Sequence, residues 1–292
     1  MDECIKCGKE IELIKSHIIS RFLGKRVYNG PGKNESFDIV SGNTIQAGMT
    51  PKINWKYLQD MPKPQLMCKS CDGSFSDDER SLAALIDSSN IFSPPISIYN
   101  SPCLIPTSLQ GLEGFMEYQL PSQQQSLVRR IGILSCWRAL HATAKSSSNE
   151  KTPSPVKRYL NSLRGLKMNT AVKEYFDHDT APEPGHFFLL LPPKTLTFKL
   201  SGNEALAPHG WDVVIFDGRE DQEPCYVVVV WFAYWMLVWL PDLANDSDDP
   251  VVHSIIAEIT AANVASWWPI KNLKPRVEKA IELYNGKPSR NK

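Results

Sequence analysis

The sequence predicts an α+β protein in which a small cysteine-rich module is followed by a helical segment and by an antiparallel β-rich domain with closing helices. Three observations predict this fold class. Two Cys-x-x-Cys pairs lie in the first quarter of the 292 residues, an amphipathic helical pattern covers the middle, and strand-forming runs separated by turns occupy much of the rest. We therefore expect a module over residues 1–88, a helical linker region over 89–179 and a β-rich α+β domain over 180–292.

The composition is that of an ordinary globular protein, with 42% apolar residues and a formal net charge of zero. Because proteins that coat nucleic acid need clustered lysine and arginine, this balance argues against non-specific coating. The N-terminus shows no basic stretch followed by an apolar run, so we expect no secretory signal and a reducing, cytoplasmic location. Three further cysteines stand alone and are expected to be buried or inert thiols: Cys103, Cys136 and Cys225.

The paired cysteines give the most specific prediction. In a reducing compartment, pairs at Cys-x-x-Cys spacing are more often metal ligands than disulfides. Four thiolates from two such pairs suit one tetrahedral Zn²⁺, and a module this small needs a stabilising metal. We therefore predict a structural zinc site formed by Cys4, Cys7, Cys68 and Cys71.

Between the two pairs, a short strand ending near residue 13 is expected to precede a strand or turn at 16–23 that carries His17. Residues 30–51 have the Gly, Pro and Asn punctuation of a loop or weak hairpin. Positions 15 to 63 hold eight basic and three acidic residues, an excess of five positive charges. This excess is either a solvated loop surface or a rim that contacts phosphate around His17.

After the second pair, Ser76 stands three residues before Glu79 and opens an apolar-periodic run, which predicts a helix begun by a capping box. A second helix is expected over 123–144 and a third over 156–166. His141 lies on the flank of the apolar stripe of the 123–144 helix. We interpret it as a satisfied core or rim residue rather than a metal ligand.

The last third predicts strands at 186–191, 195–200 and 211–216. The run 225–240 carries no charge and is rich in valine and aromatic residues, so buried strands are favoured over a buried helix or a membrane segment. Helices are expected at 251–266 and 275–284 to close the chain.

Three blocks of the first module together resemble the HNH endonuclease family in its zinc-ribbon form: Cys4-Ile5-Lys6-Cys7, Ser16-His17-Ile18-Ile19 and Leu66-Met67-Cys68-Lys69-Ser70-Cys71-Asp72. They are also similar to an uncharacterised bacterial subgroup with a Ser-His-Ile-Ile block between two Cys-x-x-Cys pairs. The resemblance covers the first module and implies a ββα-metal fold, in which a hairpin and a helix enclose one divalent cation.

By position, the resemblance implies that His17 is the general base that activates water, and that Asp72 is a ligand of a catalytic Mg²⁺ or Mn²⁺. The sequence departs from the family pattern at Ser16, where the family has a metal-binding aspartate, and at Lys63 or Gln65, near its middle asparagine. Two interpretations of these departures follow: the site is degenerate, or one of three acids in the next helix supplies the missing carboxylate, namely Asp77, Asp78 or Glu79. Capping of the helix is the competing role for Glu79.

Three functions follow from these observations. The first is a metal-dependent nuclease that hydrolyses DNA, as an effector of bacterial defence or of a mobile element. The second is a non-catalytic zinc module that binds nucleic acid and in which His17 is structural. The third is an interaction protein whose aromatic-rich C-terminal domain binds a protein partner; the run 225–240 favours it only if that run is exposed. We expect no membrane partner.

Overall fold

The computed structural model describes residues 2–19, 63–89, 104–106, 115–118, 120–146, 154–178, 180–191, 210–216, 225–232 and 235–241. Several expectations lie outside these residues: the loop at 30–51 and most of the basic excess, the strand at 195–200, the helices at 251–266 and 275–284, and Cys103. Within the described residues the protein combines helices with two antiparallel sheets, so the predicted α+β class is confirmed.

The N-terminal part contains a two-stranded sheet followed by two helices. Strand β1 (Leu13–Lys15) pairs antiparallel with β2 (Gln65–Cys68), and helices α2 (Lys69–Gly73) and α3 (Ser76–Ser89) follow directly. β2 has three consecutive buried residues, which is typical of a strand covered on both faces. The helix predicted to begin at Ser76 is therefore confirmed, and the second cysteine pair spans the junction of β2 and α2.

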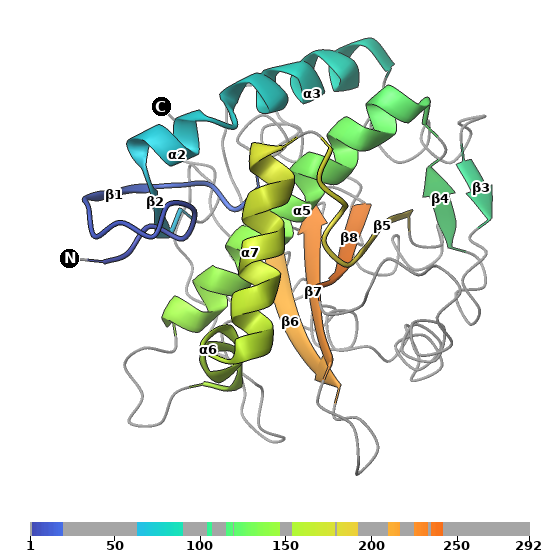
Figure 1. Ribbon diagram of the computed structural model, residues 1–292. Coiled ribbons are helices and arrows are strands. Elements are labelled where there is room, and N and C mark those ends of the chain that lie inside the picture. The colour runs from blue at the N-terminus through green and yellow to red at the C-terminus, as the bar shows by residue number, and fades with distance from the viewer. Residues whose placement is uncertain are drawn as a thin grey trace, which may run out of the picture.

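Helix α5 (Ser122–Ser146) is the central element of the protein, as Figure 1 shows. It agrees with the helix predicted over 123–144. Its middle is buried on all sides rather than along one stripe, which is typical of a helix inside a core. Gly132 allows α5 to approach the sheet closely, because a Cβ atom there would lie 2.2 Å from Cζ of Phe187.

The prediction of one helix over 156–166 is wrong, because the structure has two helices there. Helix α6 (Pro155–Leu160) ends at Asn161, and α7 (Leu163–Asp177) begins after Ser162, whose hydroxyl accepts a hydrogen bond from the Gly165 amide at 3.2 Å. Serine at this position satisfies an otherwise unpaired amide of the first turn, which favours a new helix start. Gly165 permits the tight turn, since a Cβ there would lie 2.2 Å from the Tyr159 carbonyl oxygen.

The larger sheet has six strands, all antiparallel to their neighbours, in the order β3-β4-β5-β8-β7-β6. Its strands are β3 (Leu104–Pro106), β4 (Met116–Tyr118), β5 (His186–Leu191), β6 (Gly210–Phe216), β7 (Cys225–Phe232) and β8 (Trp235–Leu240). The strands predicted at 186–191 and 211–216 are confirmed, and 225–240 forms two strands. β3 and β4 come from the segment expected to be helical and extend the sheet beyond β5.

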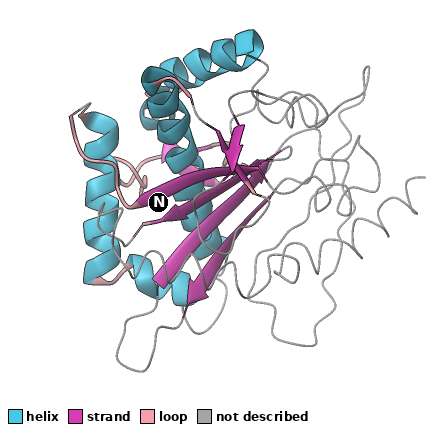
Figure 2. Cartoon of the chain, turned by 90° about the vertical axis from the view of Figure 1, so that its right-hand side faces the viewer, coloured by secondary structure: helices cyan, strands magenta, loops and turns pink. Residues whose placement is uncertain are grey.

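The described helices lie on one side of the six-stranded sheet (Figure 2). Among them, α5 contacts strands β5 to β8, and α6 contacts α7 and α5. Residues 226–230 and 236–240 are all buried, so these parts of the run 225–240 offer no exposed apolar surface to a partner. Among the described residues, none of the helices is long and apolar enough to span a bilayer.

One hydrophobic cluster runs through the whole described structure. It begins at Cys4 and Leu13, continues through Phe75 and Trp137, and reaches Trp239 in β8. The cysteine-rich residues therefore pack on the same core as the sheet, with α5 between them.

His141 of α5 is partly buried and hydrogen-bonded, in agreement with the predicted satisfied core or rim residue. Its Nε2 lies 3.0 Å from Oδ1 of Asn169 in α7, which also accepts from Nε1 of Trp137 at 2.8 Å. Burial lowers the pKa of His141 to about 4, a shift that the hydrogen bond to Asn169 opposes and the charge of Lys173 reinforces. The imidazole is therefore neutral at neutral pH.

This neutral histidine makes stability depend on pH. The unfolded state takes up the His141 proton near pH 6.5, whereas the folded state resists it down to about 4, so stability is fully present above pH 6.5 and falls as the pH drops toward 4. When the pH falls from 7 to 5, the unfolding free energy of the wild type decreases because of His141. We expect this decrease to be about 2 kcal/mol smaller in His141→Gln, which lacks the titrating group. Urea denaturation at the two pH values measures this difference. Parallel losses in the two proteins would assign the pH dependence to other groups.

Candidate metal centre and the adjoining Arg138 cluster

The sulfur atoms of Cys4, Cys7, Cys68 and Cys71 all lie within 4.8 Å of one another. The structure thus brings together the four cysteines that the sequence paired, and they can hold a metal ion such as zinc. Cys4 and Cys68 are buried, whereas Cys7 is exposed, so one edge of the cluster faces solvent. Within the described part of the chain, these four cysteines are the one group of His, Cys, Asp or Glu side chains whose ligand atoms lie close enough together to hold a metal ion.

Backbone hydrogen bonds shape the loop of the first pair. The Gly8 amide donates to the Cys4 carbonyl at 2.9 Å, and the Cys4 amide donates to Lys9 at 3.0 Å, which closes a tight turn. Gly8 has φ of 69°, a left-handed conformation that glycine adopts without strain. The Ile5 amide donates to the Leu66 carbonyl at 3.0 Å, which fixes this turn against β2.

The protein environment acts differently on the individual thiols. Burial opposes ionisation of Cys4, but hydrogen bonds from the backbone of Cys7, Cys68 and Lys6 outweigh it and lower its pKa to about 7. One of these donors, the Cys68 amide, lies 3.3 Å from the Cys4 sulfur. Burial, followed by hydrogen bonds with Cys68 and Cys7, raises the pKa of Cys71. A bound divalent cation would favour ionisation of all four thiols.

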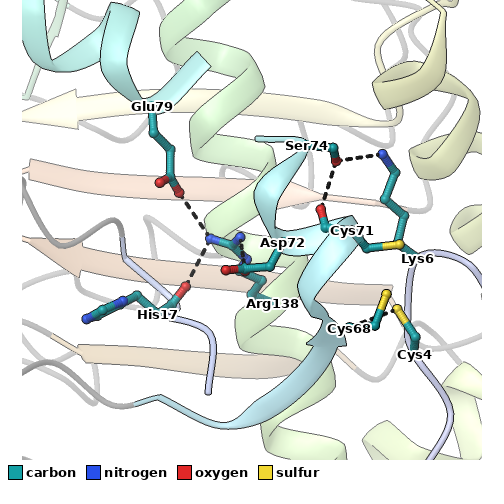
Figure 3. A network of polar contacts seen from close by, with 9 residues as sticks. All are labelled: Cys4, Lys6, His17, Cys68, Cys71, Asp72, Ser74, Glu79 and Arg138. Carbon is teal, nitrogen blue, oxygen red and sulfur yellow. Dashed lines mark hydrogen bonds and ion pairs between the residues drawn. The ribbon is translucent and has the colours of Figure 1, made fainter. Parts of the chain in front are cut away.

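Lys6, between the first two cysteines, connects the cluster to the helices around it. Its Nζ donates to Oγ of Ser74 at 3.1 Å and lies 3.0 Å from the Asp177 carboxylate at the end of α7. The same ammonium lies 4.8 Å from the centre of the Phe75 ring. These contacts hold the first pair against the second, as Figure 3 shows for Lys6, Ser74 and Cys71.

Next to the cysteines, Arg138 of α5 joins residues from three segments of the N-terminal part. Its Nη2 donates to Oδ1 of Asp72 at 2.9 Å, and its Nη1 lies 3.0 Å from the His17 carbonyl oxygen and 3.4 Å from Oε1 of Glu79. The Arg138 side chain is 2% exposed, and those of Asp72 and Glu79 are 27% and 29% exposed. Figure 3 shows the guanidinium at the centre of this group, which we call the Arg138 cluster.

Asp77, Asp78 and Glu79 are the three acids that the sequence offers as a source of the missing carboxylate, and the structure gives each a different partner. Asp77 pairs with the neighbouring Arg80 on the exposed surface of α3. Asp78 pairs with Arg130 of α5 at 2.6 Å. Glu79 is the acid that contacts the same guanidinium as Asp72.

His17 lies two residues after the end of β1 and is partly buried. Its carbonyl faces Arg138, while its imidazole points away from the guanidinium in Figure 3. Ser16, at the position where the family has an aspartate, is 1% exposed, and its hydroxyl has no hydrogen-bond partner among the described residues. Gln65 begins β2 and donates from Nε2 to the Leu13 carbonyl across the hairpin at 3.4 Å.

Arg138 is the site residue that sequence reasoning missed, although a signal was present. It stands four residues after Leu134 and three before His141, on the apolar stripe that predicted the helix. An arginine on such a stripe needs a buried acidic partner, because an unpaired buried charge is very unfavourable. Its acidic partners are 66 and 59 residues away in the sequence, so the spacing did not identify them.

Comparison of the chain with protein-family models, with curated proteins and with solved structures found no match. The resemblance to HNH endonucleases therefore rests on the three sequence blocks and on how their residues are arranged. That arrangement offers one partly buried imidazole, two carboxylates on a shared guanidinium, and a four-sulfur cluster beside them.

Proposed function

We propose that the protein is a metal-dependent nuclease of the HNH type that hydrolyses DNA phosphodiester bonds, with His17 as general base. The observation that carries this proposal is the Arg138 cluster. It groups His17, at the end of β1, with Asp72 and Glu79, which follow β2 in α2 and α3. The order of strand, strand and helix around the histidine and the carboxylates is the one that the resemblance implies.

The four cysteines fit a structural zinc ion. Zinc–sulfur bonds of about 2.3 Å place the sulfurs of a tetrahedral site about 3.8 Å apart. Because the sulfurs of the four cysteines already lie within 4.8 Å of one another, small side-chain adjustments suffice to bind the ion. Zinc there would hold the turn at Cys4 and Cys7 against the start of α2, and thereby support Asp72, the residue after Cys71.

Asp72 and Glu79 fit a hard divalent cation as carboxylate ligands. Both side chains are partly exposed, and Arg138 contacts them from the buried side. Mg²⁺ is usually held in proteins by one or two carboxylates and keeps several waters. When bound, such a cation would stabilise negative charge on the phosphorane and on the leaving 3′ oxygen.

His17 supplies the proton transfer in this proposal. Its imidazole would accept a proton from a water molecule as the water oxygen attacks the phosphorus, and the bond between phosphorus and the 3′ oxygen breaks. The imidazole points away from the Arg138 guanidinium in Figure 3. The excess of five positive charges between positions 15 and 63 supports a phosphate-containing substrate.

One observation favours a second candidate, a non-catalytic zinc module that binds nucleic acid. Asp72 already forms an ion pair with Arg138 at 2.9 Å, and a carboxylate neutralised by arginine needs no metal. In this alternative both the Arg138 cluster and His17 are structural.

Cleavage of supercoiled plasmid by the purified full-length protein distinguishes the two. We expect nicking with Mg²⁺ or Mn²⁺, none with EDTA, and about 10²–10⁴-fold slower nicking by His17→Ala, the usual contribution of a general base. His178→Ala is the matched control, because His178 is an exposed histidine at the end of α7. Nicking that survives His17→Ala would refute the assigned base, whereas DNA binding without cleavage under any metal supports the second candidate.

A further inference from the structure

We propose that Arg138 is a positioning residue, which fixes the backbone at His17 and holds the Asp72 and Glu79 carboxylates next to it. The consequence for catalysis rests on the proposed nuclease function. The positioning itself follows from the contacts of the guanidinium.

The contacts of Arg138 are directed to the N-terminal part of the chain. Its two terminal nitrogens reach the His17 carbonyl oxygen, Asp72 and Glu79, and its guanidinium carbon lies 5.6 Å from the centre of the Phe75 ring. The remaining donor, Nε, is buried and has no partner among the described residues. The hydrogen bonds of this buried guanidinium are therefore made to His17 and to the segments near it.

The position of this guanidinium is well fixed. Arg138 lies in the part of α5 that is buried on all sides, and its side chain is 2% exposed. A charge at such a depth is tolerated only when it is paired and hydrogen-bonded, and two carboxylates and one carbonyl meet that need. Because α5 also packs on strands β5 to β8, the anchor for His17 belongs to the main core of the protein.

The bond to the His17 carbonyl has a directional effect. A hydrogen bond to that oxygen fixes the plane of the peptide that follows His17, and thereby the direction in which its side chain leaves the backbone. Figure 3 shows the carbonyl facing Arg138 and the imidazole on the opposite side. Arg138 thus holds the residue by its backbone carbonyl.

A lysine cannot replace this arrangement. Arginine presents its donors in a rigid planar fork that serves several acceptors in fixed directions, whereas the lysine ammonium is a flexible point charge. Arg138→Lys therefore keeps the positive charge beside Asp72 and Glu79 but loses the joint geometry with the His17 carbonyl.

The chain contains a matched control in Arg130, about two turns earlier on α5. Its guanidinium binds Asp78 at 2.6 Å and the carbonyls of Tyr175 and Phe176 at 2.9 and 2.7 Å. Arg130 therefore joins α3 to α5 and α7 in the same manner as Arg138, but no contact to His17 is among these bonds. Arg130, whose side chain is 21% exposed, is partly buried, and Arg130→Lys removes a hydrogen-bonded arginine of α5 whose bonds go to α3 and α7.

The experiment compares Arg138→Lys with Arg130→Lys in the full-length protein. We expect both to lower the unfolding temperature, and Arg138→Lys alone to lower kcat for plasmid nicking about 10–100-fold with KM changed less than about twofold, as displacement of a catalytic group does. We also expect amide hydrogen exchange of residues 17–19 to become faster in Arg138→Lys and to stay unchanged in Arg130→Lys. Equal kcat values in the two variants would overturn the catalytic consequence.

The exchange measurement keeps this inference separate from the nuclease proposal. If the wild type cuts no DNA, the proposed function fails, but faster exchange at 17–19 in Arg138→Lys still supports positioning, and unchanged exchange overturns it. If Arg138→Lys does not fold, Glu79→Gln is the second variant, because it leaves the guanidinium in place and removes one of the charges that fix it. It is expected to accelerate exchange at 17–19 in the same direction, and its failure to do so would also refute the inference.

Discussion

We expect Cys68→Ser to abolish stoichiometric zinc binding and to unfold the N-terminal part of the protein. Cys68 is buried at the end of β2, its sulfur belongs to the four-sulfur cluster, and its amide donates to the Cys4 sulfur at 3.3 Å. Structural zinc sites contribute apparent free energies of about 10–16 kcal/mol in isolated peptides. That is comparable with the whole unfolding free energy of a domain, about 5–15 kcal/mol, so the segment around the cysteines cannot stay folded without the metal.

Metal analysis of the purified protein and hydrogen exchange of residues 2–19 and 63–89 measure both effects. The wild type should carry about one zinc per chain, as a single tetrahedral site requires. Cys136→Ala is the control, since Cys136 is a buried thiol in α5 outside the cluster and its removal should leave zinc content unchanged. Full zinc content in Cys68→Ser, or a wild type that folds without bound metal, would contradict the assigned site.

Trp137→Ala is expected to cause the largest loss of stability among substitutions in the core. The Trp137 side chain is 0% exposed, its ring centre lies 6.0 Å from that of Phe176, and its Nε1 donates to Asn169 at 2.8 Å. It therefore contributes both a ring contact and a hydrogen bond between α5 and α7. Truncation of a buried tryptophan to alanine costs about 3–5 kcal/mol, because it removes buried apolar area and leaves a cavity.

Urea denaturation of the full-length protein measures this loss. Trp137→Phe should lose less, since it retains an aromatic ring in the cavity. Leu166→Ala in α7 is the surface control; its side chain is largely exposed, and we expect a change within about 0.5 kcal/mol. A similar effect of Trp137→Ala and Leu166→Ala would mean that α7 does not depend on this contact.

Local patterns predicted the parts of the structure that depend on local chemistry. The Cys-x-x-Cys spacing predicted the four-sulfur cluster because each pair is brought together by its own short loop. Apolar periodicity predicted α5, and valine-rich runs predicted β7 and β8. In the helix and the strands the residues that determine the element lie within it, and in the cluster each Cys-x-x-Cys pair is local although the fold brings the two pairs together.

Elements that depend on distant partners were not predicted. β3 and β4 have three residues each and exist as strands because they extend the sheet from β5, a segment that follows much later in the chain. The break between α6 and α7 depends on a single serine cap inside an otherwise continuous helical pattern. The importance of Arg138 depends on Asp72 and Glu79, which only the fold brings to it.

Because Arg138 belongs to α5, the cysteine-rich residues do not form an independent structural unit. A fragment ending before α5 would contain His17, Asp72 and Glu79 but not Arg138. Asp72 and Glu79 would lose their ion-pair partner, and the His17 carbonyl would lose its hydrogen-bond donor. It would also expose Phe75, which is 1% exposed in the intact chain. Transfer of these residues to another protein therefore requires a helix that places a buried arginine next to them. The smallest unit that can be transferred is the cysteine-rich module together with α5.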